Sequence, residues 1–265
     1  SSADCDICNL PGGTPQGVES LLQCYGLDGI EFMVCDAKDT GLFPRRIVRG
    51  VHLWFYPSWM HFWRGNAELL ARDYSPEQVR CIFGDSREEW LMRFRDNFRV
   101  AGACGAEYAV FHVAHAGQGE IFSRNFFYDD RDVVEGTIEV VRELVSALPQ
   151  DCMLLYENLW WPGLTFCQPH LAAMLLEKVN YRAVGFMLDT GHLMNTNLDL
   201  RSEADGAAYV TKIYRNLGAV GKYVYGLHLH QSLSGSYVRE MMRRHAGACE
   251  SLDWQTAMAY VMRVD

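Results

Sequence analysis

Side chains suited to acid–base or metal chemistry stand at the ends of short apolar runs throughout this chain. They are Glu31, His52, His112, Glu157, Asp189, His228 and His230. Few lysine or arginine residues accompany them. If these carboxylates and imidazoles converge, the cluster is unfavourable in charge unless a divalent cation neutralises it. The residue types therefore predict a metal centre.

The sharpest local motif is Asp189-Thr190-Gly191-His192, in which an acid leaves an apolar run and an imidazole follows three residues later. Tyr156-Glu157-Asn158 lies upstream of it, and His228-Leu229-His230 lies downstream. Taken singly, a strand-end Glu31 or His52 is explained equally well by hydrogen bonding in a polar environment. Coincidence of the three motifs favours a functional site.

The apolar runs that carry these residues are predicted to be strands. They cover residues 6–9, 29–34, 48–54, 108–112, 152–158, 184–189 and 223–230. Stretches with helical spacing alternate with them, over 15–24, 86–103, 130–148, 169–178 and 204–217, and a further helix is expected to start at Ser75-Pro76-Glu77. Near-continuously apolar strands that alternate with helices predict a parallel sheet covered on both faces.

Seven or eight such units favour a (β/α)₈ TIM barrel as one domain over residues 1–265, and no G-x-G-x-x-G motif follows a strand. The carboxyl ends of barrel strands open on one face, where barrel enzymes keep their sites. After Leu252-Asp253-Trp254 a helix is expected to about Met262. The chain stops at Asp265, so the eighth strand is predicted to be missing or incomplete.

The composition bounds the class of protein. A chain of 265 residues with 49% hydrophobic and 22% charged residues is long enough for a large core. The net charge of −9 disfavours nucleic acid as a partner, and no signal peptide or membrane span is expected. Nine scattered cysteines, an odd number, predict a reducing, cytoplasmic location.

An incomplete last strand leaves an edge of the predicted barrel unpaired. It therefore favours a homodimer in which the second subunit covers that edge.

Taken together, these motifs resemble the xylose isomerase-like TIM barrel superfamily, which includes sugar and sugar-phosphate isomerases and epimerases and the endonuclease IV family. The resembling segments also include Gly29-Ile30-Glu31, Val51-His52, Val110-Phe111-His112 and Leu252-Asp253-Trp254. The resemblance implies that Glu157, Asp189 and His230 bind a divalent metal. His192 would be a catalytic residue or contact the substrate. The second glutamate of the epimerase pattern has no counterpart before Asp265.

The endonuclease IV pattern adds histidines from earlier strands, which His52 and His112 match, and a later histidine, which His245 matches. Arg243 stands where that pattern has an aspartate. The resemblance therefore implies His52, His112, His228 and His245 as further ligands of metal or substrate. The lost aspartate lowers the expectation of a three-metal nuclease.

The leading hypothesis is a metal-dependent isomerase or epimerase that acts on a sugar, a sugar phosphate or a related polyol. Glu157 would serve as both metal ligand and acid–base group. Mn²⁺ or Zn²⁺ suits the ligand set best, with Co²⁺ and Mg²⁺ as further candidates. Trp54 and Trp160 are predicted to contact the substrate, and Arg239 to bind an anionic group. The alternatives are a metal-dependent hydrolase or phosphodiesterase, and a non-catalytic ligand-binding barrel.

Overall fold

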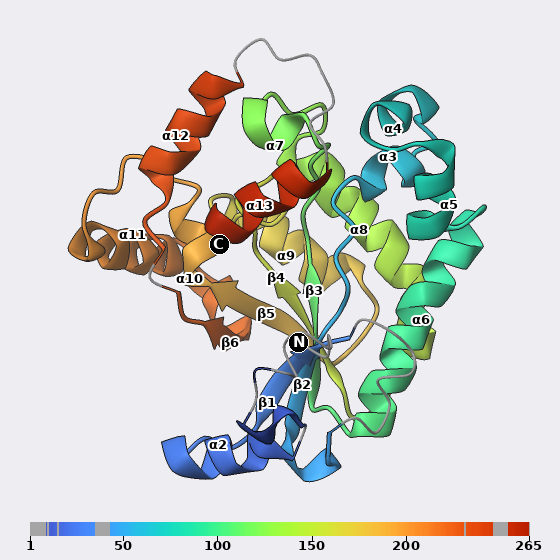
Figure 1. Ribbon diagram of the computed structural model, residues 1–265, viewed down its shortest axis with the longest axis vertical. Helices are drawn as coiled ribbons and strands as arrows, with labels where there is room; N and C mark the ends of the chain where they lie inside the picture. Colours follow the sequence, from blue (N-terminus) through green and yellow to red (C-terminus); the bar gives the residue numbers. More distant parts are fainter. Residues whose placement is uncertain are drawn as a thin grey trace.

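A curled parallel sheet organises the protein (Figure 1). The computed structural model describes residues 9, 11–14, 16–34, 43–230, 232–245 and 254–264. Within these residues the sheet has six strands in the order β1-β2-β3-β4-β5-β6, and every neighbouring pair is parallel. The strands are β1 (Ile30–Met33), β2 (Val48–His52), β3 (Tyr108–His112), β4 (Met153–Glu157), β5 (Val184–Asp189) and β6 (Val224–His228).

Seven of the helices in the described residues lie where the sequence predicts them, and the other five were not predicted. They are α2 (Gly17–Tyr25), α3 (Trp59–Trp63), α4 (Ala67–Asp73), α5 (Pro76–Phe83), α6 (Arg87–Cys104), α7 (Glu120–Ser123), α8 (Asp130–Leu144), α9 (Pro169–Lys178), α10 (Thr190–Met194), α11 (Glu203–Asn216), α12 (Gly235–Arg244) and α13 (Trp254–Val264). Short 3₁₀ turns cover Pro11–Gly13, Arg45–Ile47, Val145–Ala147 and Gly218–Tyr223. None of the helices in the described part of the chain is long and apolar enough to cross a lipid bilayer.

Local signals explain the helix boundaries. Ser75 caps α5 through a capping box with Gln78, and Pro76 occupies the first turn, where it needs no hydrogen-bond acceptor. Ser86 caps α6, and Gly105 ends it in the left-handed conformation. The stretch predicted as one helix over 130–148 divides into α8 and a 3₁₀ turn, since the chain tightens in its last turn.

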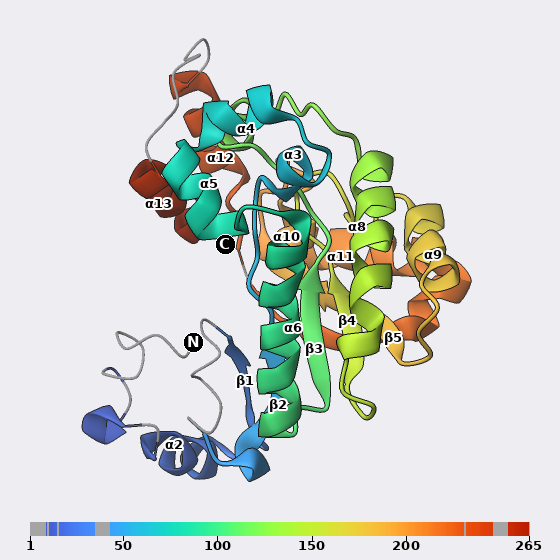
Figure 2. The same ribbon diagram turned by 90° about the vertical axis from the view of Figure 1, so that its right-hand side faces the viewer.

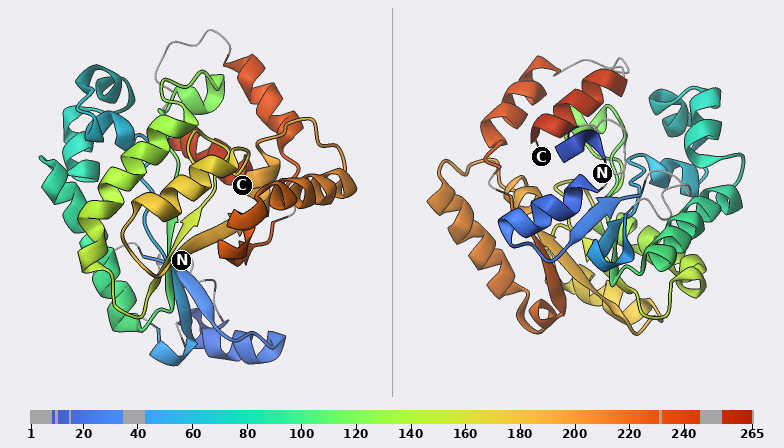
Figure 3. Two further views of the ribbon diagram at one scale, coloured as in Figure 1. Left: turned by 180° about the vertical axis from the view of Figure 1, so that it is seen from behind. Right: turned by 60° about the horizontal axis from the view of Figure 1, so that its bottom comes forward.

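The sheet is a barrel with an open side. The helices α6, α8, α9 and α11 cover its outer face, and α12 and α13 lie beyond the carboxyl ends of the strands (Figure 1; Figure 3, left). Figure 2 shows β1 and α2 extending away from the remaining elements, whereas β2 stays paired with β3. Six of the seven predicted strands are confirmed as parallel strands of an incomplete α/β barrel. The seventh, at 6–9, falls mainly outside the described residues.

Strand alternation separates the core from the site. Ala109, Phe111, Leu154 and Tyr156 belong to the main core cluster, which includes residues from the covering helices. The residues between them face the barrel interior, where Val110, Leu155 and Met187 form a small separate cluster. His112, Glu157 and Asp189 follow these three residues at a spacing of two, so the pleat places them on the same inner face.

Candidate metal centre

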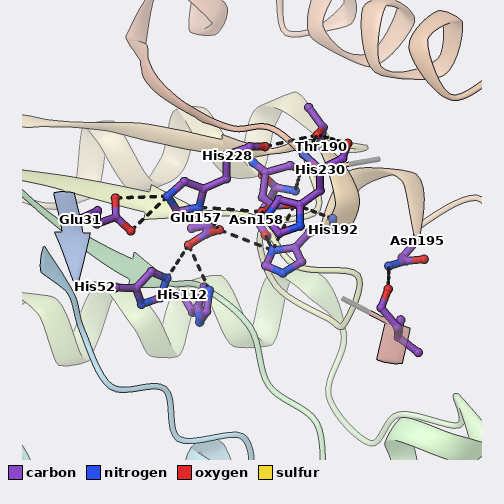
Figure 4. A network of polar contacts seen from close by, with 12 residues as sticks. Glu31, His52, His112, Glu157, Asn158, Thr190, His192, Asn195, His228 and His230 are labelled. Carbon is purple, nitrogen blue, oxygen red and sulfur yellow. Dashed lines mark hydrogen bonds and ion pairs between the residues drawn. The ribbon is translucent and has the colours of Figure 1, made fainter. Parts of the chain in front are cut away.

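The carboxyl ends of five strands bring their polar residues together around Glu157 (Figure 4). His112 pairs with Glu157 in the register of β3 and β4, and Asp189 pairs with His228 in the register of β5 and β6. Oε2 of Glu157 lies 3.0 Å from Nε2 of both His52 and His112. Oε1 lies 2.8 Å from Nδ1 of His228. One buried carboxylate therefore contacts three histidines from three strands.

Two groups of possible ligands share that carboxylate. The first is His52, His112 and Glu157, and the second is Glu157, Asp189 and His228. Asp189 Oδ2 lies 3.8 Å from Nδ1 of His228. Because both groups contain Glu157, they could hold one ion, or two neighbouring ions that share this carboxylate.

Hydrogen bonds fix the tautomers of two histidines. Nδ1 of His52 lies 3.0 Å from the carbonyl oxygen of Leu53, and Nδ1 of His192 lies 2.8 Å from that of Asn158. A carbonyl only accepts, so each ring donates from Nδ1 and its neutral form presents the Nε2 lone pair. For His52, that lone pair faces the Glu157 carboxylate at 3.0 Å. Burial opposes protonation of His52, but the hydrogen bond and the charge interaction with Glu157 raise its pKa, so the protonated ring can donate from Nε2 to the carboxylate. With a metal ion between the two groups, the neutral ring would offer its Nε2 lone pair instead, and backbone-anchored imidazoles are the usual form of metal-binding histidines.

The charge states follow from burial and contact. Burial opposes ionisation of Glu157, but the charge interaction with His112 and hydrogen bonds from His112, His228 and His52 hold its pKa well below the usual range. Burial lowers the pKa of His112 to about 4, which keeps that ring neutral at pH 7. Burial also opposes protonation of His228, yet hydrogen bonds to Glu157 and Glu31 raise its pKa to about 10. The positive charge needed beside Glu157 thus resides on His228, where a metal ion would replace the proton.

Two further residues join the site: Glu31, one of the strand-end candidates for which no ligand role was predicted, and Asn158, which was not among the predicted site residues although it lies inside a quoted motif. Glu31 Oε1 lies 3.1 Å from Nε2 of His228 and joins β1 to β6 across the barrel. The Asn158 side chain donates to the carbonyl of Asp189 and accepts from its N–H. Asn158 therefore fixes the ends of β4 and β5 relative to each other.

The H-x-H pair divides between two positions. His228 is the member that contacts Glu157, whereas His230 lies farther out, with Nε2 3.4 Å from Asp189 Oδ2. The His230 side chain is 41% exposed. The backbone N–H of His230 donates to the Thr190 hydroxyl at 2.8 Å, which holds the segment after β6. The role of His230 as a metal ligand remains a prediction.

The remaining predicted residues lie at different distances from the centre. His192 is buried, and its Nδ1 lies 3.6 Å from Glu157 Oε1. Trp160 packs against His192, with ring centroids 5.1 Å apart. Arg239 is paired with Asp199 at 2.9 Å, and His245 packs against the Phe122 ring. Neither of these last two side chains has a recorded contact with Glu157 or Asp189, so their proposed roles gain no support from the geometry.

A cavity of about 260 Å³ opens beside the centre, and His112 and His192 form part of its wall. Trp54 and Trp160, which the sequence predicts to contact substrate, both line it. The cavity therefore lies next to the inner face that carries Glu157.

A second buried group of polar residues lies beyond the main site. It contains His61, Asp73, His115 and Glu120. His61 is 2% exposed, since α3 packs against α8 and the loop after β3. Met60 N–H donates to Nδ1 of His115 at 3.2 Å, so the neutral ring carries its proton on Nε2 and offers no lone pair there. The two histidines lie 3.9 Å from the carboxylates of Asp73 and Glu120, respectively, and we call these four residues the second polar network.

The network predicts a measurable pH dependence of stability. Burial, reinforced by the charge of Arg72, lowers the pKa of His61 to about 4, from about 6.5 in an unfolded chain. Between pH 6.5 and pH 4, His61 therefore binds a proton in the unfolded chain but not in the folded protein. The resulting stability is present above pH 6.5 and is lost as the pH falls toward 4. We expect His61→Gln to reduce the loss of unfolding free energy between pH 7 and pH 5 by about 2 kcal/mol.

Urea unfolding at both pH values, with chelator present, measures this difference. Burial raises the pKa of Asp73 to about 6, so Asp73 makes the folded protein more stable as the pH falls. Because Asp73 is present in both the wild type and the variant, this contribution largely cancels when their pH dependences are compared. The matched control is His170→Gln, an exposed histidine on α9. Equal pH dependence in the wild type and His61→Gln would contradict the prediction.

Comparisons with known proteins agree with this architecture. A family model described as a xylose isomerase-like TIM barrel matches residues 83–261. No match was found among curated protein sequences. Among solved structures, 3-keto-D-glucoside 4-epimerase from E. coli has a TM-score of 0.52 at 11% identity, over 97% of this chain and 84% of that one.

Two further structures resemble the chain less closely in three dimensions. A D-tagatose 3-epimerase-like protein has a TM-score of 0.49 at 13% identity, over 97% of this chain and 92% of that one. Endonuclease IV from Thermus thermophilus has a TM-score of 0.47 at 16% identity, over 94% of this chain and 92% of that one. At these identities the likeness concerns the fold alone.

Proposed function

The chain belongs to the xylose isomerase-like TIM barrel family, and from that premise we propose that it is a metal-dependent enzyme that isomerises or epimerises a hydroxyl- and carbonyl-bearing small molecule. The observation that carries the proposal is the buried Glu157 carboxylate, which contacts His52, His112 and His228 from three strands. Such a mixed carboxylate and imidazole set suits Mn²⁺ or Zn²⁺, and also Co²⁺ or Mg²⁺.

We infer that His52, His112, Glu157, Asp189 and His228 hold the metal. When bound, a divalent ion polarises a carbonyl and lowers the pKa of a neighbouring hydroxyl. Glu157 supplies negative charge to the centre, and the low pKa of its carboxyl suits a ligand better than a proton-accepting base. Its predicted role as a ligand is therefore supported more strongly than its predicted role in acid–base catalysis.

Proton exchange with the substrate is assigned to His230 in this proposal. Its Nε2 lies 3.4 Å from Asp189 Oδ2, and its ring is the most exposed of the histidines around the centre. Asp189 can orient the imidazole and stabilise its protonated form, as a carboxylate does for a general base. His192 is anchored by its Nδ1 to the Asn158 carbonyl, with that atom 3.8 Å from Asp189 Oδ1, and in this proposal it contacts the substrate or the metal.

Metal-dependent hydrolysis of a phosphodiester is the second candidate. The observation in its favour is that two ligand groups share Glu157, because two neighbouring ions commonly bind and activate the nucleophile in hydrolases. The net charge of −9 and the absence of Arg and Lys from the described cavity wall disfavour a nucleic-acid substrate. The isomerase is therefore the preferred proposal.

Elemental analysis of protein purified without chelator or added metal tests the proposal. We expect about one Mn or Zn per chain, and we expect Asp189→Asn to lose most of it. Glu203→Gln, an acidic residue of the outer helix α11, is the control and should retain the metal. About two ions per chain would favour the hydrolase. No metal in the wild type, even after reconstitution, would overturn both enzymes and favour the ligand-binding barrel.

A further inference from the structure

The wall of the cavity beside the metal centre is strongly apolar. Its aromatic side chains are Trp54, Phe55, Tyr56, Tyr74, Trp160 and Trp161. Ile82 from α5 and Val261 from α13 enclose it from two further elements. No Arg, Lys, Asp or Glu belongs to the part of this wall that the structure describes.

Such a wall is poorly suited to a free sugar. Each sugar hydroxyl that loses water needs a new hydrogen-bond partner, and an unpaired buried polar group lowers affinity substantially. A phosphate would in addition need a cationic partner. The one arginine predicted to provide it, Arg239, is paired with Asp199 and does not line the cavity.

Three buried polar atoms of the wall residues lack hydrogen-bond partners within the described structure. They are Nδ1 of His112, the hydroxyl oxygen of Tyr74 and Nε1 of Trp161. The indole N–H can only donate, so it suits a single oxygen acceptor on the bound molecule. Nε2 of His112 is directed to Glu157, which makes this ring the link between the cavity and the metal centre (Figure 4).

We propose that this cavity binds an aromatic or alicyclic ring of the substrate, and that the hydroxyl or carbonyl groups at one end of that ring reach the metal centre. The inference rests on the proposed function for the polar end of the substrate. The size of the cavity fits the apolar end: a cavity of about 150 Å³ accepts benzene, and this one is about 260 Å³. The substrate is then a ring compound with few oxygens rather than a free sugar or sugar phosphate.

A pair of hydroxamates tests the inference, since benzohydroxamate and acetohydroxamate carry the same metal-binding group and differ by a phenyl ring. Burial of the phenyl group is expected to make benzohydroxamate bind the zinc-loaded protein about tenfold or more tightly, by calorimetry. Val261→Phe, which fills the cavity from α13, should remove this preference. Met262→Phe, at the 72% exposed neighbouring position, should retain it.

Ile82→Phe fills the cavity from α5 and serves as a second variant in case Val261→Phe does not fold, which circular dichroism checks. Equal affinities of the two hydroxamates for the wild type would overturn the inference while leaving the metal centre intact. If neither hydroxamate binds, the metal centre has failed, and binding of 2-naphthol to chelator-treated protein decides the cavity alone. Binding that Val261→Phe weakens supports the cavity, and binding that it leaves unchanged, or no binding, overturns it.

Discussion

Glu157→Gln is expected to weaken metal binding by at least about 100-fold and to abolish any activity that depends on the metal. Both ligand groups contain this one carboxylate. Its Oε2 faces His52 and His112, and its Oε1 faces His228. Glutamine retains the size of the side chain but supplies no negative charge, and the amide nitrogen cannot act as a ligand. The measurement is the zinc dissociation constant, by competition with a chromophoric chelator.

Two glutamine variants control this experiment. Glu31→Gln alters the contact on the far side of His228 and leaves Glu157 in place, and we expect a loss of about tenfold, as for other residues that orient a ligand. Glu107→Gln, an exposed partner of Arg49, should have no effect. Unchanged zinc affinity in Glu157→Gln would place the metal elsewhere, with the network of His61, Asp73, His115 and Glu120 as the next position to test.

Trp90→Ala is expected to lower the free energy of unfolding by about 3–5 kcal/mol. Trp90 is 1% exposed and stands at the centre of the aromatic cluster that joins α6 to the loop after β2. Its ring stacks on Trp59 at 5.8 Å and contacts Tyr56 and Phe94 edge-on at 5.8 and 5.2 Å. Alanine leaves a cavity that these rigid rings cannot fill.

Trp90→Phe separates packing from hydrogen bonding at the same position. Nε1 of Trp90 has no hydrogen-bond partner within the described residues, so replacing the indole with a phenyl ring breaks no hydrogen bond. We expect a loss of about 1–2 kcal/mol, from volume alone. Urea unfolding measures both variants, with Phe127→Ala, at a 61% exposed position, as the control. A loss below about 1 kcal/mol in Trp90→Ala would contradict the prediction and show that the neighbouring rings repack into the space.

The strands and the inner face of the barrel could be predicted from the sequence, because both depend on local patterns. An apolar run that ends in a polar residue specifies a buried strand and the side chain at its end, as at 152–158 and 184–189. The caps at Ser75 and Ser86 are likewise local. These features require no knowledge of contacts between distant segments.

Other features depend on contacts that no local pattern records. His228 and His230 are two residues apart, so in an extended strand both side chains point to the same face. The sequence therefore could not say which of them contacts Glu157. The answer depends on β6 ending at His228 and on its register with Asp189. His61 lies on a five-residue helix whose burial comes from contacts with α4 and α8. The apolar cavity likewise is assembled from side chains that lie far apart in the sequence.

The contact between Glu31 and His228 joins residues 197 positions apart, from the first and the last described strands. Closing so large a loop is entropically costly, and contacts of this kind form late in folding. This separation implies an order of folding: the helices and neighbouring strands can assemble first, and the edge strands β1 and β6 come together last. A metal ion that needs residues from both sides of the sheet would therefore bind only the fully folded chain, and its binding would report that folding is complete.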